Sequence, residues 1–94
     1  MKCAFNKKKV QRWANIFKCL GHDKRLEIIF GLLNEECSVG EIQSRLEISQ
    51  SSLSQHLRIL RDAGILKGVK EGNKVIYSLE NEEIKKLLEN IDLY

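Results

Sequence analysis

Apolar residues recur at helical spacing in the first third of the chain. Their period predicts an amphipathic helix over about residues 8–20, with apolar positions at Val10, Trp13, Ala14, Phe17 and Leu20. Gly21 is suited to end this helix, and Asp23 can cap the next one. In that second helix only Glu27 and Gly31 interrupt a run of apolar residues from 26 to 33. A helix that is apolar on nearly all sides is expected to be central and buried.

Two shorter helices are predicted next, joined by a tight turn. The segment Ser38-Val-Gly-Glu41 is a capping box, because the serine hydroxyl can accept from the third backbone N–H while the glutamate reaches back. After a turn at residues 47–48, Ser49 caps a helix that runs to about residue 63. There Gly64 can take the left-handed conformation that ends it. Residues 38–63 are therefore a predicted helix-turn-helix.

The hydrophobic period then changes from 3.6 residues to 2, which is typical of strands. The segments 65–71 and 74–79 flank Gly72-Asn73, a pair suited to a two-residue hairpin turn. A last amphipathic helix begins near Asn81 and carries an apolar stripe at Ile84, Leu87, Leu88 and Ile91. The predicted fold is mainly α with a small β-hairpin, in the order α-α-α-α-β-β-α, and residues 1–94 make a single domain.

Composition and charge narrow the class of protein. A domain of 94 residues buries a modest fraction of its surface, so self-association is a natural source of stability. Residues 1–25 carry eight Lys and Arg against one Asp, and residues 50–75 carry five against two acids. A basic face would attract a polyanion. No apolar run approaches the ~20 residues of a membrane span, and none follows the basic N-terminus as in a signal peptide, so we expect no membrane partner and a cytoplasmic location.

The second helix of the predicted helix-turn-helix has an unusual outer face. With Leu53, Leu57 and Leu60 inward, a rotation of about 100° per residue places short polar side chains and Arg58 on the opposite side. Glutamine can bond adenine bidentately, arginine can bond guanine, and serine can bond bases or phosphates. A merely solvated face would more readily use Glu, Lys and Ala, which form helices better than Ser. We therefore expect double-stranded DNA to be bound here by Gln50, Ser51, Ser54, Gln55, His56 and Arg58.

Two parts of this expected DNA surface keep a second interpretation. His56 projects nearer to the core side than Gln55, so it can equally be a half-buried residue satisfied by one hydrogen bond. Neither His56 nor His22 has a second metal-ligating residue at helical spacing from it, which argues against a zinc site. In the hairpin, Lys70, Asn73 and Lys74 can grip a phosphate strand or enter a minor groove. Exposed hairpins also need charge to block edge-to-edge pairing, and both interpretations can hold together.

The stretch from Ser38 to Leu66, with its core Ser-Gln-Ser-x-x-Ser-x-His-Leu, resembles the ArsR/SmtB family of winged-helix repressors, especially the HlyU/BigR branch. The segments 20–26 and 75–79 fit as well, so the match covers about residues 16–80. The resemblance implies a winged helix-turn-helix with residues 65–79 as the wing. It also implies a homodimeric repressor that binds an imperfect palindrome in its own or a neighbouring promoter. The dimer would pair through the helices at 8–20 and 81–92, with contacts from Trp13, Phe17, Ile84, Leu87, Leu88 and Ile91.

The sensing sites of that family do not carry over to this chain. Its arsenite and cadmium sensors have Cys-Val-Cys where this chain has Ser38-Val-Gly40, and its zinc sensors place Asp and His on a last helix that here contains no His. Its reactive-sulfur sensors use one cysteine at the position of Phe30 and another near the last helix, whereas no Cys lies beyond Cys37. We therefore expect no cofactor and no metal, and the sequence names no inducer.

Three cysteines remain, Cys3, Cys19 and Cys37, an odd number without the spacing of a disulfide framework. Cys37 beside the capping box and Cys3 on a lysine-rich arm lie where a thiolate is favoured. Cys19 is expected to pack as a small apolar residue. The three thiols could bind a soft ion or form a disulfide switch, and the alternative is that they have no joint role.

The residues favour one of three classes of function. An enzyme fits least, because the chain shows no nucleophile–base pair, phosphate loop or paired carboxylates. A winged helix that contacts proteins without binding DNA is the second hypothesis, although Glu or Leu would then be expected on the outer face of the second helix. The leading hypothesis is a sequence-specific DNA-binding transcriptional regulator, and a thiol- or soft-metal-responsive derepressor is its variant.

Overall fold

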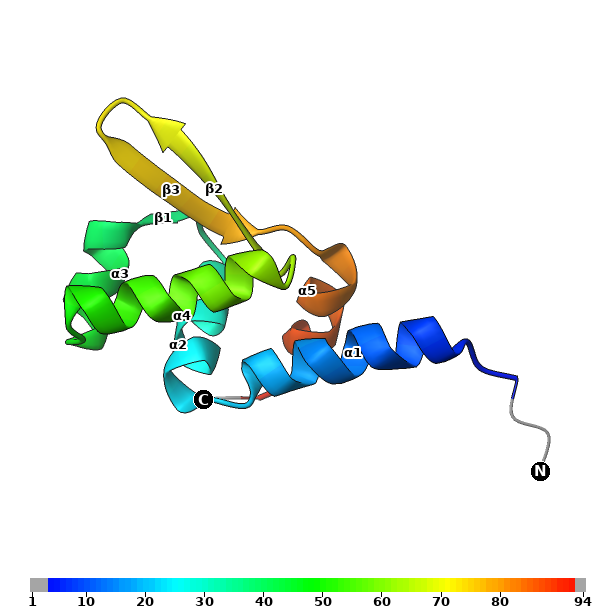
Figure 1. Cartoon of the computed structure of the whole chain (residues 1–94). Coiled ribbons are helices and arrows are strands. Elements are labelled where there is room, and N and C mark those ends of the chain that lie inside the picture. The colour runs from blue at the N-terminus through cyan, green and yellow to red at the C-terminus, as the bar shows by residue number, and fades with distance from the viewer. Residues whose placement is uncertain (1–3, 93–94) are drawn as a thin grey trace.

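The computed structural model describes residues 4–92, which form five helices and a three-stranded antiparallel sheet (Figure 1). The elements are α1 (Lys7–Leu20), α2 (Asp23–Leu32), β1 (Cys37–Ser38), α3 (Val39–Leu46), α4 (Gln50–Asp62), β2 (Leu66–Glu71), β3 (Lys74–Leu79) and α5 (Glu82–Glu89). The predicted order of helices and hairpin is confirmed, and β1 is an addition to it. No helix within residues 4–92 is long and apolar enough to cross a membrane.

Strand β1 is too short to be read from a period of two. It pairs with β3 in the register Cys37↔Tyr77 and Ser38↔Ile76, so the strand order is β1-β3-β2. Ser38 is also the N-cap of α3: its hydroxyl accepts from the Glu41 N–H at 3.2 Å, and Glu41 accepts from the Ser38 N–H at 3.1 Å. The predicted capping box is confirmed, and its first residue ties the helix-turn-helix to the wing.

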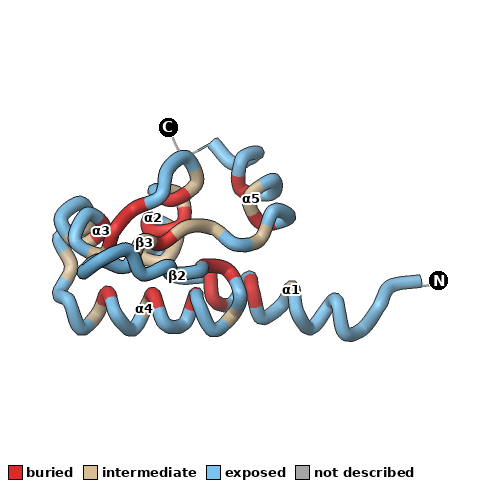
Figure 2. The backbone as a smooth tube through the Cα atoms, turned by 90° about the horizontal axis from the view of Figure 1, so that it is seen from above, coloured by how far each residue is buried: buried red, intermediate tan, exposed pale blue. Residues whose placement is uncertain are grey.

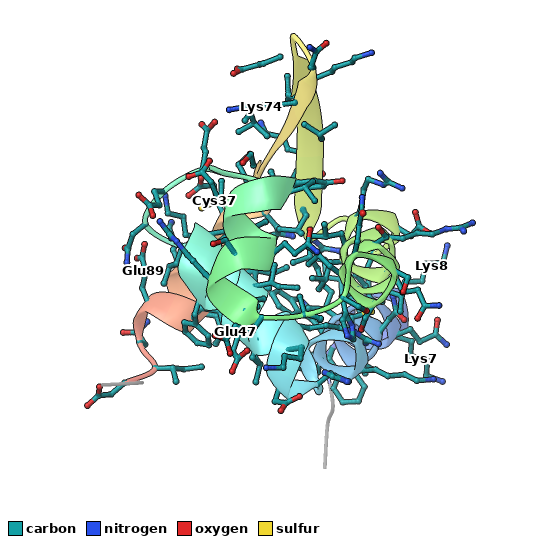
Figure 3. All side chains as sticks on the ribbon, turned by 90° about the vertical axis from the view of Figure 1, so that its left-hand side faces the viewer. Lys7, Lys8, Cys37, Glu47, Lys74 and Glu89 are labelled. Atoms are coloured by element: carbon teal, nitrogen blue, oxygen red, sulfur yellow. The ribbon has the colours of Figure 1, made fainter. Side chains whose placement is uncertain are left out.

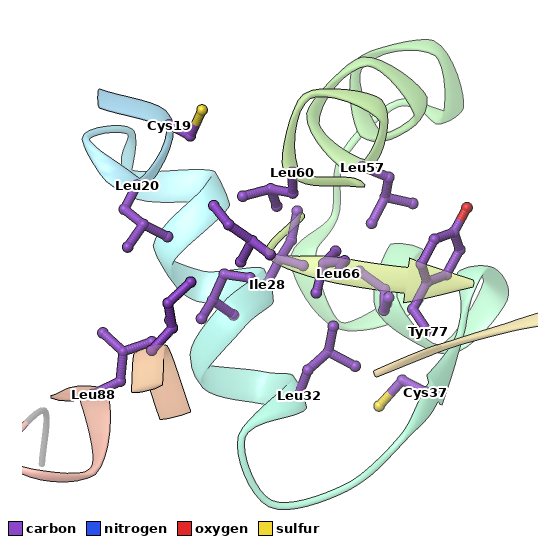
Figure 4. Packing of buried hydrophobic residues seen from close by; sticks show 14 of the residues in the cluster. Cys19, Leu20, Ile28, Leu32, Cys37, Leu57, Leu60, Leu66, Tyr77 and Leu88 are labelled. Atoms are coloured by element: carbon purple, nitrogen blue, oxygen red, sulfur yellow. The ribbon is translucent and has the colours of Figure 1, made fainter. Parts of the chain in front are cut away.

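The core lies between α2, α4, the base of the wing and α5 (Figure 4). Ile28 and Ile29 of α2 are fully buried, as the nearly all-apolar pattern predicted. In Figure 2 the buried positions of α4 lie along its inner side only, and most of the rest of the helix is exposed. These positions are Leu53, Leu57 and Leu60, which confirms the predicted orientation of α4.

Backbone conformation at the helix ends corrects one expectation and confirms others. His22, not Asp23, is the N-cap of α2, and its Nδ1 accepts from the Lys24 N–H at 3.1 Å. Asp23 is the first helical residue, and its carboxylate accepts from the same N–H. Ser49 caps α4 as predicted, and Gly64 takes a φ of +75° after that helix. Gly72 has a φ of +62°, as the two-residue turn between β2 and β3 requires.

Helix α5 ends sooner than the sequence predicted. Asn81 caps it through its side-chain oxygen, which accepts from the backbone N–H of residues 83 and 84. The last helical residue is Glu89 rather than residue 92, so Ile91 lies beyond the helix end.

The two glycines at positions 31 and 64 should respond oppositely to alanine. A Cβ at Gly31, inside α2, meets no atom within 4 Å, so Gly31→Ala should raise the free energy of unfolding by about 0.5 kcal/mol. Gly64 has its positive φ, so Gly64→Ala should lower it by roughly 1 kcal/mol. Urea denaturation of both variants measures the two changes in the free energy of unfolding. A shift in the same direction for both would contradict the backbone assignment.

Candidate nucleic-acid interface

The exposed face of α4 is held outward by the leucines on its inner side. Gln50, Ser51, Ser54, Gln55 and Arg58 are all exposed, so five of the six predicted α4 residues lie on one accessible surface. The start of the helix is fixed by Ser49, whose hydroxyl accepts from the Ser52 N–H at 3.2 Å. Short polar side chains at this start allow backbone and ligand to approach closely, as base reading in a major groove requires.

Arg58 is held only loosely. Its Nε lies 3.8 Å from Asp62 Oδ2, one turn along α4, and the two side chains are 76% and 66% exposed. An ion pair in such contact with solvent contributes little, about 0–1 kcal/mol. The guanidinium can therefore exchange this carboxylate for a phosphate or a base at small cost.

An open groove joins the start of α4 to the wing. It is about 710 Å³ in volume and lies between the first turns of α3, the N-terminal end of α4 and the turn between β2 and β3. Gln50 of α4 lines it together with Asn73 and Lys74 of the wing. Ser44 and Arg45 of α3 line it too, and no feature of the sequence pattern had singled them out. The structure thus brings together residues that were predicted as two separate contacts.

The one acidic residue lining this groove is already engaged. Glu41 accepts from the Ser38 N–H, and this backbone hydrogen bond is the main reason why the pKa of its carboxyl is lowered. The Ser38 side chain, Arg45 and Lys74 lower it further. A carboxylate that is hydrogen-bonded and flanked by cations opposes an anionic ligand less than a free one does.

His56 is turned away from the exposed face of α4. It is half-buried, and its Nδ1 accepts a hydrogen bond from Arg25 Nε at 3.2 Å. Its ring lies against that of His22, with centroids 4.6 Å apart. Of its two predicted interpretations, the structure shows the one in which a single hydrogen bond satisfies a half-buried imidazole.

Arg25, like Ser44 and Arg45, is a residue that sequence reasoning missed. Besides bonding His56 of α4, its Nη1 donates to the Cys19 carbonyl at the end of α1 at 3.1 Å. One side chain near the start of α2 therefore connects the end of α1 with the middle of α4. Arg25 and His56 are 31 positions apart, so no helical or strand period could have paired them.

The cysteines do not form a joint site in the part of the chain that the structure covers. Cys19 is buried, as predicted, and Cys37 is buried at 3% exposure. Burial raises the pKa of the Cys37 thiol, and Arg45 offsets this only in part, so the expected stabilisation of a thiolate there is wrong. The two residues lie on opposite sides of the core in Figure 4, and Cys3 lies outside the described residues. Residues 4–92 contain no cluster of three or more His, Cys, Asp or Glu that could hold a metal ion.

The residues predicted for dimer contacts fall into two groups. Ile84 and Leu88 are 1% and 2% exposed and belong to the core of the protomer itself, so their assignment to an intersubunit contact is corrected. Phe17, Leu87 and Ile91 are 40–54% exposed, and Trp13 is partly buried beside them. A helical stripe identifies apolar positions, but two adjacent leucines point about 100° apart, so one can be buried while the other is exposed. Trp13, Phe17 and Leu87 line a common groove between α1 and α5.

The contacts of His56 predict a loss of stability in mild acid. Burial is the main cause that lowers its pKa below the ordinary value of 6.5, with His22 and Arg25 adding to it and Asp23 opposing it. The unfolded chain thus binds this proton more readily, and the stability held above about pH 6.5 is lost as the pH falls through the folded pKa. Between pH 7.5 and 5, wild type should lose more free energy of unfolding than His56→Gln in urea titrations. Gln55→Ala, on the exposed face, should follow wild type, and equal pH slopes for all three would contradict the prediction.

Comparison with known proteins places this geometry in a family. Residues 22–67 match the family described as bacterial regulatory protein, arsR family. The transcriptional activator HlyU of Vibrio cholerae is 46% identical over 74 residues, which cover 79% of this chain and 68% of that protein. A solved structure of HlyU from Vibrio cholerae aligns with a TM-score of 0.86 at 42% identity, over 89% of this chain and 91% of that one.

Two further solved structures are similar. The transcriptional repressor BigR of Xylella fastidiosa aligns with a TM-score of 0.80 at 32% identity, over 88% of this chain and 85% of that one. The homodimeric winged helix-turn-helix domain of Mb0332 from Mycobacterium bovis aligns with a TM-score of 0.81 over 94% of this chain and 84% of that one, and at 22% identity it supports the fold alone. Because a regulator 46% identical matches over 68% of its own length, the chain belongs to the ArsR family and is a DNA-binding transcriptional regulator rather than an enzyme.

Proposed function

We propose that this regulator is a homodimeric repressor that binds an imperfect palindrome in its own or a neighbouring promoter. The observation that carries the proposal is the exposed Ser, Gln and Arg face of α4, whose first residue, Gln50, lines one groove with the wing. A protein-contact module would have no need of Gln50, Asn73 and Lys74 around a common groove of this volume. Side chains of this kind bond base edges and phosphates.

The proposed roles follow the position of each side chain. Residues at the start of α4 would enter the major groove and meet base edges, namely Gln50, Ser51, Ser54 and Gln55. Arg58 and the wing residues Lys70, Asn73 and Lys74 would contact the sugar–phosphate backbone, which sets the register of the protein on the duplex. We assign His56 to holding α4 in place, since its ring is engaged by Arg25 and His22.

The proposed dimer surface is formed by Val10, Trp13, Phe17, Leu87 and Ile91, of which all but Trp13 are exposed. The Trp13 and Phe17 rings lie 5.8 Å apart, so they present one aromatic surface on α1. Contiguous exposed apolar side chains of this size mark association sites on a small domain. A two-fold dimer would place two α4 helices for successive major grooves, and Mb0332, which shares the fold, is a homodimer.

Substitutions on α4 should separate DNA reading from folding. Gln55→Ala and Arg58→Ala should each raise the Kd for the upstream promoter fragment roughly 5- to 100-fold, the range expected for loss of one good base or phosphate contact. Fluorescence anisotropy on that fragment and on a scrambled duplex measures the effect. The dimer should stay intact in sedimentation, because both side chains lie outside the apolar surface.

Lys85→Ala is the matched control for these two variants, because α5 lies across the molecule from α4 in Figure 2. It should bind the promoter fragment as wild type does. Unchanged affinity in Gln55→Ala and Arg58→Ala would favour the protein-contact alternative. Equal affinity of wild type for promoter and scrambled DNA would contradict a specific operator.

Substitution of the apolar surface should dissociate the dimer. Phe17→Glu and Leu87→Glu put a charge on side chains that are 54% and 40% exposed, so the protomer should keep its fold and its circular dichroism spectrum. Sedimentation should show a monomer, and operator affinity should fall at least tenfold because one half-site is lost. Val69→Glu on the wing, where the valine is 50% exposed, is the control and should remain dimeric. A Phe17→Glu protein that stays dimeric would exclude this surface.

A further inference from the structure

Helix α1 has a polar, basic face that neither the core nor the apolar surface uses. At about 100° per residue, its exposed polar side chains Lys7, Lys8, Gln11, Asn15 and Lys18 gather on one side. The buried residues Ile16, Cys19 and Leu20 point in a second direction, and the stripe with Phe17 in a third. The sequence of α1 contains no acidic residue, so this face has no carboxylate of its own helix to neutralise it.

Helix stability does not account for these lysines. Cations in the first turn of a helix are disfavoured by the helix dipole, and Lys7, Lys8 and Lys9 occupy that turn of α1. Within the described residues, the one ion pair between a basic side chain of this helix and α5 joins Arg12 Nη1 to Glu83 Oε1 at 3.8 Å. An external anion would offset the unfavourable position of the first-turn lysines.

DNA bound by α4 would supply such an anion, because α1 lies next to α4. Seen from above, the two helices lie end to end along the same edge of the molecule (Figure 2). Seen along that edge, Lys7 and Lys8 lie on the side of the molecule on which α4 lies (Figure 3). At about 1.5 Å per residue, the 13 residues of α4 and the 14 of α1 add up to roughly 40 Å, a little more than one turn of B-DNA.

We infer that the basic face of α1, through Lys7, Lys8 and Lys18, binds the phosphate backbone of the operator beside the segment read by α4. This inference rests on the proposed DNA binding and extends the footprint past the helix-turn-helix and wing. Cations then recur along one edge, from Arg58 and Arg61 on α4 to the three lysines on α1. The contact carries no base information, and it adds affinity by releasing counterions from the duplex.

The proposed dimer leaves this face open. The apolar stripe of α1, with Val10, Trp13 and Phe17, is centred roughly 130° around the helix from the basic face. Lys8 lies about 160° around the helix from Val10, so a second protomer seated on the stripe leaves it open, while Lys7 lies between the two faces, about 60° from Val10. One helix would serve association on one side and DNA on another.

The salt dependence of binding tests the inference. We compare wild type with the double variant Lys7→Gln and Lys8→Gln on the promoter fragment and on a scrambled duplex, by anisotropy from 50 to 300 mM salt. Each phosphate contact contributes about 0.9 to the slope of log K against log salt. The slope should be about 1 to 2 shallower in the variant, by the same amount on both duplexes, with unchanged circular dichroism and sedimentation.

The charge-matched control is Lys85→Glu, which lowers the net charge by the same two units on α5, across the molecule from α4 (Figure 2). Its slope should equal that of wild type. An unchanged slope for the α1 variant overturns the inference, and an equal loss in the α5 control assigns the effect to net charge and overturns it as well. Failure of the proposed function has a different signature: wild type would not prefer the promoter fragment, even where the α1 variant lowers the slope on both duplexes.

Discussion

The packing of α4 through a single stripe of leucines is the constraint on which the rest of the structure depends. Leu53 and Leu60 have no exposed surface and Leu57 has 3%, so the rotation of the helix about its own axis has no freedom. Turning it by one residue would bury a serine or glutamine and expose a leucine, at a cost of several kcal/mol by the usual value of a buried aliphatic side chain. The polar residues of α4 face outward because this stripe faces inward.

Local sequence chemistry was sufficient for most of the architecture. The capping box at Ser38, the cap at Ser49 and the positive φ at Gly64 and Gly72 each depend on a few neighbouring residues, so their patterns could be interpreted without tertiary information. The same holds for the orientation of α4, because a period of 3.6 needs only one helix. Residues 65–79 could be predicted as a hairpin for a similar reason, because a period of two needs only the strand itself.

The features that escaped prediction are the ones that depend on distant segments. Strand β1 exists because β3 lies beside it, and two residues have no period. Leu87 and Leu88 are adjacent in sequence, yet only the packing of α5 on the body decides that Leu88 is core. Arg25 meets His56 only after α2 and α4 have come together. The helix start beside Cys37 favours a thiolate, but burial of the side chain outweighs that influence and raises the pKa of the thiol.

Ser38 belongs to the sheet and to the capping box at the same time, and this has a mechanical consequence. It pairs with Ile76 of the wing while its hydroxyl holds the first turn of α3. The wing and the helix-turn-helix are thereby joined at one residue, so we expect a change in the orientation of one to be transmitted to the other. In the proposed two-fold dimer, the angle between protomers would then be the adjustable coordinate, and operator spacing would be matched by rotation of whole subunits.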